Sequence, residues 1–329
     1  MRVVTPTGVS ESRRLPGAGA GPSPDRLFLG SEGTLGVITE AWMRILERPE
    51  HRCSSSVSFD DPASAMAAVR TIAQSGINPS NCRLLDPGEA GLAGASTSGA
   101  WVLVLGVESA HHPVDRDLMM LVEIAEGHGG RSMKRPAGGD VGDRRDRAAE
   151  AWRSTFLRMP YVRDAMARMG AIVETFETAT TWDRVEDLYH DVRKEISRTV
   201  QEVTGSPGLV NCRFTHAYPD GAAPYFTVIA SGRRGSELSM WDEIKAASME
   251  VLGCHRATVT HHHAVGRDHR PGYDRQRPEP FARAFAAAKS ALDPAGILNP
   301  GVLLDPREFA PGPPKQERRS TAQPLDFSQ

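Results

Sequence analysis

The sequence is poor in cysteine and aromatic residues, and it lacks any long apolar run. Its four cysteines, Cys53, Cys82, Cys212 and Cys254, stand far apart without a CxxC pair, which argues against a disulfide framework and a structural zinc knuckle. We therefore expect reduced, structural thiols in a cytoplasmic protein. The longest apolar runs, such as residues 101–106, are far shorter than the roughly 20 residues of a membrane-spanning helix.

An excess of charge of one sign is also missing. The 329 residues include 39 basic and 41 acidic ones, a net charge of −2, so no overall field attracts nucleic acid or an anionic membrane. The first residues, MRVVTPTGVSESRR, lack the apolar core of a secretory signal. With 40% hydrophobic and 24% charged residues, the composition is that of a soluble globular protein. The length indicates about two domains.

Hydrophobic periodicity predicts one order of elements twice: strand, helix, strand, strand, helix, strand. In the first half these are residues 53–59, 60–76, 82–85, 101–107, 114–126 and 131–134. In the second half they are residues 171–176, 180–203, 209–218, 225–230, 237–252 and 257–260. The second long helix is expected to start from a capping box at Thr180 and Asp183.

Two successive βαββαβ units predict an α+β fold with a large, mainly antiparallel sheet. We expect helices to cover one face of this sheet and the other face to form a wall over a bound molecule. A short hairpin at the start of the chain and a helix at residues 281–292 complete the expected elements. Residues 138–147 read as a solvated loop, and residues 307–329 as a disordered tail.

The first stretch that indicates chemistry is GSEGTLG, residues 30–36. Glycines at positions 30, 33 and 36 surround Glu32 and Thr34, and such a bare main chain lets amide groups approach a bound molecule closely. A tight turn between two strands would use the same residues. The spacing matches neither the G-x-G-x-x-G nor the G-x-x-x-x-G-K fingerprint, so neither a nicotinamide Rossmann site nor a P-loop is indicated.

The second stretch is THHHAVGRDHRPGYD, residues 260–274. Its three adjacent histidines, His261, His262 and His263, suit proton transfer or phosphate binding, and plain loop histidines are the alternative. On an extended strand neighbouring side chains face opposite sides, so only His261 and His263 would share one. A closed metal site would need further ligands. Candidates for such ligands are His216, His255 and His269. We predict no metal.

Two longer motifs resemble a known family. PDRLFLGSEGTLGVITEAWMRI, which contains the glycine-rich stretch, and LDPAGILNPGVLL, residues 292–304, are similar to segments of the FAD-binding oxidases and transferases of the vanillyl-alcohol oxidase superfamily. Within it, PYVRD, ETFETATTWDRVEDLY and HHHAVGRDHRPGY most resemble the alkyldihydroxyacetonephosphate synthases. The resemblance implies that residues 1–50 end a PCMH-type FAD-binding domain, that 51–270 form a substrate cap domain, and that 271–306 return to the FAD domain.

The resemblance also implies roles for individual residues. Tyr225 is expected to exchange a proton with the substrate carbon, Arg163 to bind the substrate phosphate, and His261, His262 and His263 to line the active site. The residues expected to contact FAD are Glu32, Gly33, Thr34, Leu35, Gly36, Val37 and Ile38.

The implied reaction is an FAD-dependent exchange of the acyl group of acyl-dihydroxyacetone phosphate for a fatty alcohol, a step of ether-lipid synthesis without net oxidation. The substrate would be a phosphorylated or carboxylate lipid or small molecule, met through a peripheral membrane contact if it is a lipid. One alternative is an FAD-linked oxidase or dehydrogenase of a 2-hydroxy acid. The other is a non-catalytic, cap-like remnant that binds a ligand or a partner chain.

Family members carry a glycine-rich loop for the FAD pyrophosphate in sequence that precedes the region matched here. Residues 1–24 contain no equivalent loop. We therefore expect this chain to resemble the C-terminal part only, with the other half of the FAD site supplied by a homodimer or by a separate chain.

Overall fold

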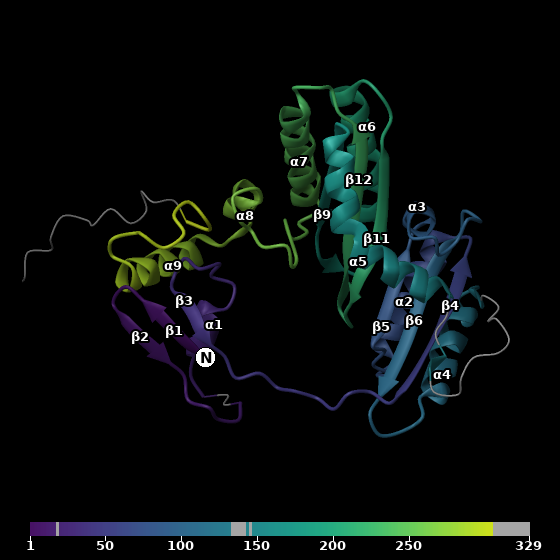
Figure 1. The fold of residues 1–329 in the computed structure, drawn as a ribbon, viewed down its shortest axis with the longest axis horizontal. Coiled ribbons are helices and arrows are strands. Elements are labelled where there is room, and N and C mark those ends of the chain that lie inside the picture. Colours follow the sequence, from purple (N-terminus) through teal and green to yellow (C-terminus); the bar gives the residue numbers. More distant parts are fainter. Residues whose placement is uncertain (18–19, 133–142, 145–146, 305–329) are drawn as a thin grey trace, which may run out of the picture. The chain divides into compact units, whose positions relative to one another are not determined.

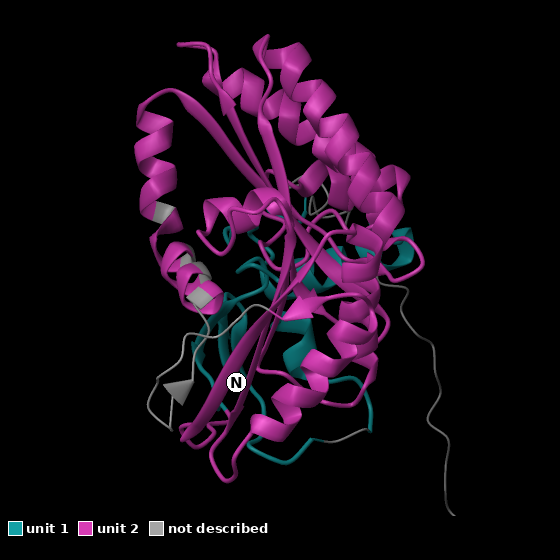
Figure 2. Cartoon of the chain, turned by 90° about the vertical axis from the view of Figure 1, so that its right-hand side faces the viewer, with its two compact units in different colours: residues 1–43, 277–329 teal, residues 44–276 magenta. Residues whose placement is uncertain are grey.

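The computed structural model describes residues 1–17, 20–132, 143–144 and 147–304. It forms two compact units, one of residues 1–43 and 277–329 (unit 1) and one of residues 44–276 (unit 2), coloured separately in Figure 2. The expected tail at 307–329 lies outside the described residues. So does the expected loop at 138–147, apart from Asp143–Arg144 and Arg147.

Unit 1 contains a small antiparallel sheet in the order β2-β1-β3. Strands β1 (Arg2–Thr5) and β2 (Gly8–Glu11) form the predicted hairpin, and β3 (Val37–Glu40) pairs with the other edge of β1. Helices α1 (Pro24–Phe28) and α9 (Glu279–Leu292) belong to the same unit. The glycine-rich stretch is thus the segment that leads into β3.

Unit 2 is built on a mainly antiparallel sheet (Figure 1), in which β8 is the strand that pairs in parallel, with β4. Its described strands follow the order β10-β12-β11-β5-β6-β4-β7, with β9 also on β12. The first-half strands are β4 (His51–Phe59), β5 (Asn81–Leu85), β6 (Trp101–Ser109), β7 (Arg131–Ser132) and β8 (Asp143–Arg144). The second-half strands are β9 (Ala171–Glu177), β10 (Thr180–Thr181), β11 (Leu209–Ala217) and β12 (Gly221–Ser231).

The main core of unit 2 lies between one face of this sheet and the helices predicted from periodicity. These helices are α2 (Pro62–Gln74), α4 (Asp115–Gly127), α6 (Val185–Thr204) and α7 (Glu237–Cys254). The core joins strand residues such as Leu103 and Phe226 to helix residues such as Ile72 and Ile196, all fully buried. Both halves place their strands in the same order, β5-β6-β4 and β11-β12-β9. The predicted α+β fold with a large antiparallel sheet is confirmed.

Helices also pack on the opposite face, so the expectation that helices cover one face only is wrong. Leu85, Val102 and Val104 face away from the main core and form a second apolar cluster with residues of α3 (Pro87–Leu92) and α5 (Arg147–Arg168). Helix α3 is short, but it has a clear start, because the Asp86 side chain accepts a hydrogen bond from the Glu89 amide and proline follows.

One predicted boundary and one predicted strand are wrong. Helix α6 starts after Arg184 rather than at Thr180, because Thr180 and Thr181 pair with β12 as the short strand β10. Residues 257–260 form no strand, because their polar groups bind elsewhere: the Thr258 amide and hydroxyl bond the main chain of Ala179, and the Val259 amide bonds the Gln276 side chain of α8 (Arg270–Gln276). No helix among the described residues is both long enough and apolar enough to span a membrane.

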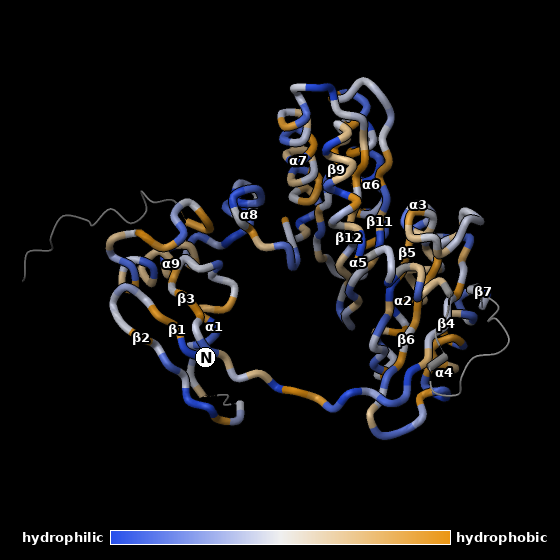
Figure 3. The backbone as a smooth tube through the Cα atoms, viewed as in Figure 1, coloured by the Kyte–Doolittle hydropathy of each residue, from blue (hydrophilic) through white to orange (hydrophobic). Residues whose placement is uncertain are grey.

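Exposed apolar side chains gather in the irregular segment that follows β3. Trp42, Met43, Ile45 and Leu46 are each at least 65% exposed, and the segment shows as an orange stretch of the tube in Figure 3. Contiguous exposed apolar residues mark a surface that suits contact with another protein segment.

Candidate active site

A row of polar side chains crosses three neighbouring strands of unit 2. The antiparallel register places Tyr225 of β12 opposite Glu177 of β9 on one side and opposite Arg213 of β11 on the other. Residues opposite each other in a ladder share one face of the sheet. Because the adjacent residues Phe176 and Phe226 are buried under the helices in the main core, the row lies on the opposite face, the one that carries α3.

Tyr225 lies directly against a cation. The guanidinium carbon of Arg213 is 3.7 Å from the centre of the Tyr225 ring, within the range of a cation–π contact. Arg213 is itself fixed, because its Nη1 donates to Glu89 Oε2 at 2.9 Å and both side chains are nearly buried. The sheet register and this ion pair therefore hold a positive charge on one face of the phenol.

Glu177 organises the three histidines through their main chain. Its Oε1 accepts hydrogen bonds from the amides of His261 (3.0 Å), His262 and His263 (2.7 Å), and from the Thr260 hydroxyl (3.2 Å). Residues 261–263 (the histidine turn) therefore wrap around a carboxylate that is fully buried. Three successive amides that converge on one anion form a compact turn, and not an extended strand on which neighbouring side chains would face opposite sides.

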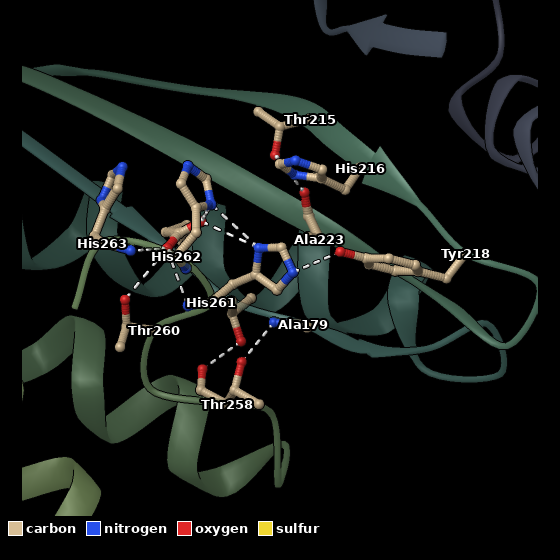
Figure 4. Close-up of polar contacts among 12 residues, drawn as sticks. Ala179, Thr215, His216, Tyr218, Ala223, Thr258, Thr260, His261, His262 and His263 are labelled. Carbon is tan, nitrogen blue, oxygen red and sulfur yellow. Dashed lines mark hydrogen bonds and ion pairs between the residues drawn. The ribbon is translucent and has the colours of Figure 1, made fainter. Parts of the chain in front are cut away.

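The imidazoles of the histidine turn form a connected cluster, shown in Figure 4. His262 Nδ1 is in close contact with Glu177 Oε2, and His261 Nδ1 lies 3.1 Å from His262 Nδ1. His261 Nε2 is 2.9 Å from the Tyr218 hydroxyl, and the His263 ring centre lies 5.0 Å from that of Tyr225. The structure thus brings Tyr225 and all three predicted histidines together, and because residues 261–263 form a turn, the alternation of side chains along a strand does not apply to them.

Burial and neighbouring charges shape the electrostatics of the cluster. Burial alone would raise the pKa of Glu177, but the amides of the histidine turn hold that pKa below its ordinary value. Burial lowers the pKa of His263, and burial together with the neighbouring imidazoles lowers that of His216. These two histidines therefore favour the neutral form, which can accept a proton, and Glu177 favours the anion.

Two overlapping groups within the cluster have the donor atoms of a metal site. They are His216 with His261 and His262, and Glu177 with His262 and His263, with the atoms of each group within 4.8 Å of one another. The other expected ligands lie elsewhere: His255 pairs with Asp191 at 3.0 Å, and His269 Nδ1 bonds the Ala264 carbonyl at 3.0 Å. In the described cluster, the Nδ1 atoms of His261 and His262 already contact each other, and Nδ1 of His262 also contacts Glu177. The short distances between donor atoms are therefore the one argument for a metal among the described residues.

Arg163 lies in a different place. It is exposed on α5 and lines a pocket of about 370 Å³ with Ile172, Leu238 and Trp241. This pocket is at the Ala171–Val173 end of β9, whereas Glu177 ends the strand, four residues or about 13 Å further on. The structure therefore does not bring Arg163 to the histidine turn, and its role in binding phosphate stays a prediction.

The predicted FAD segment is held in unit 1 by a buried lysine of α9. Lys289 Nζ donates to the carbonyls of Thr34 and Leu298, both at 2.7 Å, and to Asp293 Oδ2 at 2.5 Å. Lys289 and Asp293 are at most 3% exposed. One side chain thus joins the glycine-rich stretch to the LDPAGILNPG motif, two parts of the sequence that resemblance alone had linked.

The same segment has features that suit a flat aromatic cofactor. Glu32 and Gly33 adopt positive φ values of 50° and 74°, a main chain that lets a ligand approach closely. Val37 and Ile38 are exposed by 55% and 46%. Thr34, Leu35 and Gly36 are buried within unit 1. Val37, Ile38 and the main chain of Glu32 and Gly33 are therefore the parts of this segment that suit contact with FAD. The buried residues 34–36 hold them in position.

Several residues of these sites were not predicted from the sequence. Glu177 lies inside the quoted motif ETFETATTW, and Lys289 precedes the quoted LDPAGILNPG, so both were near a signal that resemblance supplied. No signal in the sequence identified Arg213, Glu89 or Tyr218, because their partners are distant in sequence.

Comparison with known proteins identifies the class. Residues 48–303 match the family described as "FAD linked oxidases, C-terminal domain", and the chain belongs to this family. FAD is the cofactor of the family.

The chain is similar to alkyldihydroxyacetonephosphate synthases of Trypanosoma brucei brucei (27% identity over 98% of this chain and 54% of that protein) and Caenorhabditis elegans (28%, 93% and 54%). It is also similar to the glycolate oxidase subunit GlcD of Bacillus subtilis (strain 168), at 25% identity over 87% of this chain and 58% of that protein. A solved alkyldihydroxyacetonephosphate synthase shares the fold, with a TM-score of 0.69 at 21% identity over 91% of this chain and 52% of the other. The chain spans about half the length of the curated relatives it matches.

Proposed function

We propose that this chain carries the substrate-side active site of an FAD-dependent alkyldihydroxyacetonephosphate synthase-like transferase. The observation that carries the proposal is the position of Tyr225, which lies between the Arg213 guanidinium and the His263 ring on the face of the sheet opposite the main helices. A proton-exchanging phenol needs a neighbouring cation and a proton acceptor, and both are in place. The similarity to synthases of the same name supports this choice over other FAD-linked reactions.

In this proposal each group has a distinct task. Tyr225 exchanges a proton with the substrate carbon, and Arg213 stabilises the negative charge that the phenol bears while deprotonated. The histidine turn moves protons to and from the fatty alcohol and the leaving carboxylate. FAD, when bound along Glu32–Ile38, supplies an electron sink for the substrate carbon.

A second candidate is an FAD-linked oxidase or dehydrogenase of a 2-hydroxy acid. It is favoured by the similarity to the glycolate oxidase subunit and to the D-lactate dehydrogenase [cytochrome] 1 of Saccharomyces cerevisiae (strain ATCC 204508 / S288c), the latter at 26% identity. The same histidine turn would then accept the hydroxyl proton of the substrate.

One experiment separates the two candidates. The chain is incubated with FAD, alone and with a segment that carries the glycine-rich half of the FAD-binding domain, and is then desalted. A retained, shifted flavin band identifies the competent preparation. Formation of labelled ether from labelled fatty alcohol in that preparation supports the transferase. Anaerobic bleaching of the flavin by 2-hydroxy acids, without ether formation, contradicts it and favours the oxidase.

The proposal includes a binding partner for unit 1. The relatives are about twice as long as the matched region, and Trp42 and Met43, which follow β3 at the end of unit 1, offer an exposed apolar surface. We propose that the other half of an FAD-binding domain covers this surface, supplied by the same polypeptide, by a second copy or by a separate chain.

Arg163 provides a test of the substrate. We expect Arg163→Ala to raise the KM for a phosphorylated substrate by roughly tenfold or more, because a charge-assisted hydrogen bond contributes about 1.5–3 kcal/mol. Arg168→Ala, at an exposed arginine of the same helix, is the matched control and should leave KM unchanged. Equal KM values for the wild type and the Arg163 variant would remove Arg163 from the phosphate site.

A further inference from the structure

The protons of the histidine turn can be assigned from the chemistry of Glu177. Its carboxyl is fully buried and receives three main-chain amides and the Thr260 hydroxyl on Oε1. Donors that converge on a carboxylate stabilise its ionised form. An ionised carboxylate only accepts hydrogen bonds. Any group that bonds the other oxygen, Oε2, must therefore be a donor.

This fixes the tautomer of His262. Its Nδ1 is in contact with Glu177 Oε2, a buried atom to which the described residues supply no hydrogen bond of good geometry. A nitrogen lone pair at that position would face the carboxylate, so the hydrogen belongs on Nδ1. In a neutral imidazole only one ring nitrogen is protonated, so Nε2 of His262 bears a free lone pair. No described residue makes a hydrogen bond to this atom, and the His262 side chain is 44% exposed.

The assignment continues to the neighbouring residues. His261 Nδ1 lies 3.1 Å from Nδ1 of His262 and 3.5 Å from Glu177 Oε2. The one Nδ1 hydrogen of His262 is then shared between the carboxylate and His261 Nδ1, which accepts it. The Nε2 of a neutral His261 then carries the hydrogen and donates to the Tyr218 hydroxyl at 2.9 Å. In this assignment the donors run outward from His262: its Nδ1 hydrogen faces Glu177 Oε2 and His261 Nδ1, and His261 Nε2 donates to the Tyr218 hydroxyl.

We propose that Glu177 is a positioning residue that holds His262 in the Nδ1–H tautomer and so makes Nε2 of His262 the proton acceptor of this site. The ring centre of His262 lies 6.4 Å from that of Tyr225 and 5.3 Å from that of His216, so His262 belongs to the same cluster of side chains as the predicted proton-exchanging phenol.

The proposal rests on the proposed function in one respect, which is that the proton accepted belongs to an alcohol substrate. As the alcohol approaches, its O–H bond breaks, the electron pair stays on oxygen and the proton moves to Nε2. The imidazolium that forms is balanced by the Glu177 carboxylate on the other side of the ring. The polar contacts of the Glu177 carboxylate described above go to Thr260 and to the histidine turn, so we expect its effect on the reaction to be exerted through His262.

Glu177→Gln is the decisive variant, because the turn dictates how the new amide lies. The three main-chain amides require an oxygen at the position of Oε1, so the amide NH2 must point toward His262 Nδ1. A donor there forces His262 into the Nε2–H tautomer and removes the free lone pair. We expect turnover to fall by roughly 10²–10⁴-fold, the usual contribution of a positioned acid or base.

The tautomer itself is measured by ¹⁵N NMR of the full chain labelled in histidine, with His262→Gln used to assign the signals. In the wild type we expect a protonated Nδ1 and an unprotonated Nε2 at His262, and in Glu177→Gln the reverse. Glu174→Gln is the matched control, because it changes another buried carboxylate of β9 that bonds Lys245 at 2.6 Å on α7. It should leave the His262 signals unchanged.

A protonated Nε2 in the wild type, or an unchanged tautomer in Glu177→Gln, overturns the proposal. If Glu177→Gln does not fold, Glu177→Asp replaces it: a carboxylate still only accepts, so the wild-type tautomer must persist there, and a switch contradicts the proposal. Expected tautomers in a chain that forms no ether would reject the transferase and leave the role of Glu177 intact.

Discussion

Tyr225→Phe is expected to reduce turnover of the reconstituted enzyme by roughly 10²–10⁴-fold, the contribution of a positioned acid or base. The change removes the phenol oxygen alone. The ring that remains still lies under the Arg213 guanidinium and beside His263, and the β9–β12–β11 register does not involve the side chain. Folding and flavin binding should therefore be the same as in the wild type.

The measurement is kcat together with the visible flavin spectrum of each protein. Tyr161→Phe is the control, because Tyr161 is 77% exposed on α5 and its loss should have no effect on either quantity. Wild-type turnover in Tyr225→Phe would exclude the phenol from proton exchange. A loss of flavin together with turnover would instead point to damage of the fold.

Lys289→Met is expected to reduce the free energy of unfolding by about 3–5 kcal/mol, the usual cost of removing one partner of a buried ion pair. Asp293 would keep its hydrogen bonds from the amides of Ile297 and Leu298 but lose its cation. The Thr34 carbonyl would lose its donor as well. The glycine-rich stretch would then no longer be joined to α9.

Denaturant unfolding measures this effect, and flavin retention measures its consequence for the predicted FAD segment. Arg283→Met on the same helix is the control, since the Arg283 and Glu279 side chains of this pair are 75% and 79% exposed, and exposed ion pairs contribute little. Similar stability of the two variants would show that the clamp on Thr34 is not needed to hold unit 1 together.

The order of elements in unit 2 could be predicted because a helix or strand that is buried on one face has apolar residues at regular spacing. Helices α2, α4, α6 and α7 all have apolar residues at such spacing. All but α6, which starts at Val185 and not at Thr180, lie close to their predicted bounds. Helix α3 was missed because six residues are too few for a periodic pattern. Residues 257–260 are β-prone by composition, but their hydrogen bonds go to side chains and to a loop, which local sequence does not reveal.

The candidate site was predicted in part. Resemblance identified Tyr225 and the three histidines, and the structure brings them together. It could not identify Glu177, which looks like an ordinary polar residue at the end of a strand until the amides that bind it arrive 84 to 86 residues later in the chain. The Arg213–Glu89 pair joins residues 124 apart. Such partners depend on the order of strands in the sheet, which no local pattern specifies.

The clamp on Glu177 uses main-chain amides, which every residue except proline possesses. The path of the chain at residues 261–263 is therefore separable from the identity of the side chains there. Evolution or design can exchange one imidazole for another functional group without rebuilding the loop, provided that the buried carboxylate of β9 remains. The fold therefore allows the side chains at three positions to change while the main chain keeps its path. These positions lie near a tyrosine whose position is set by strand pairing.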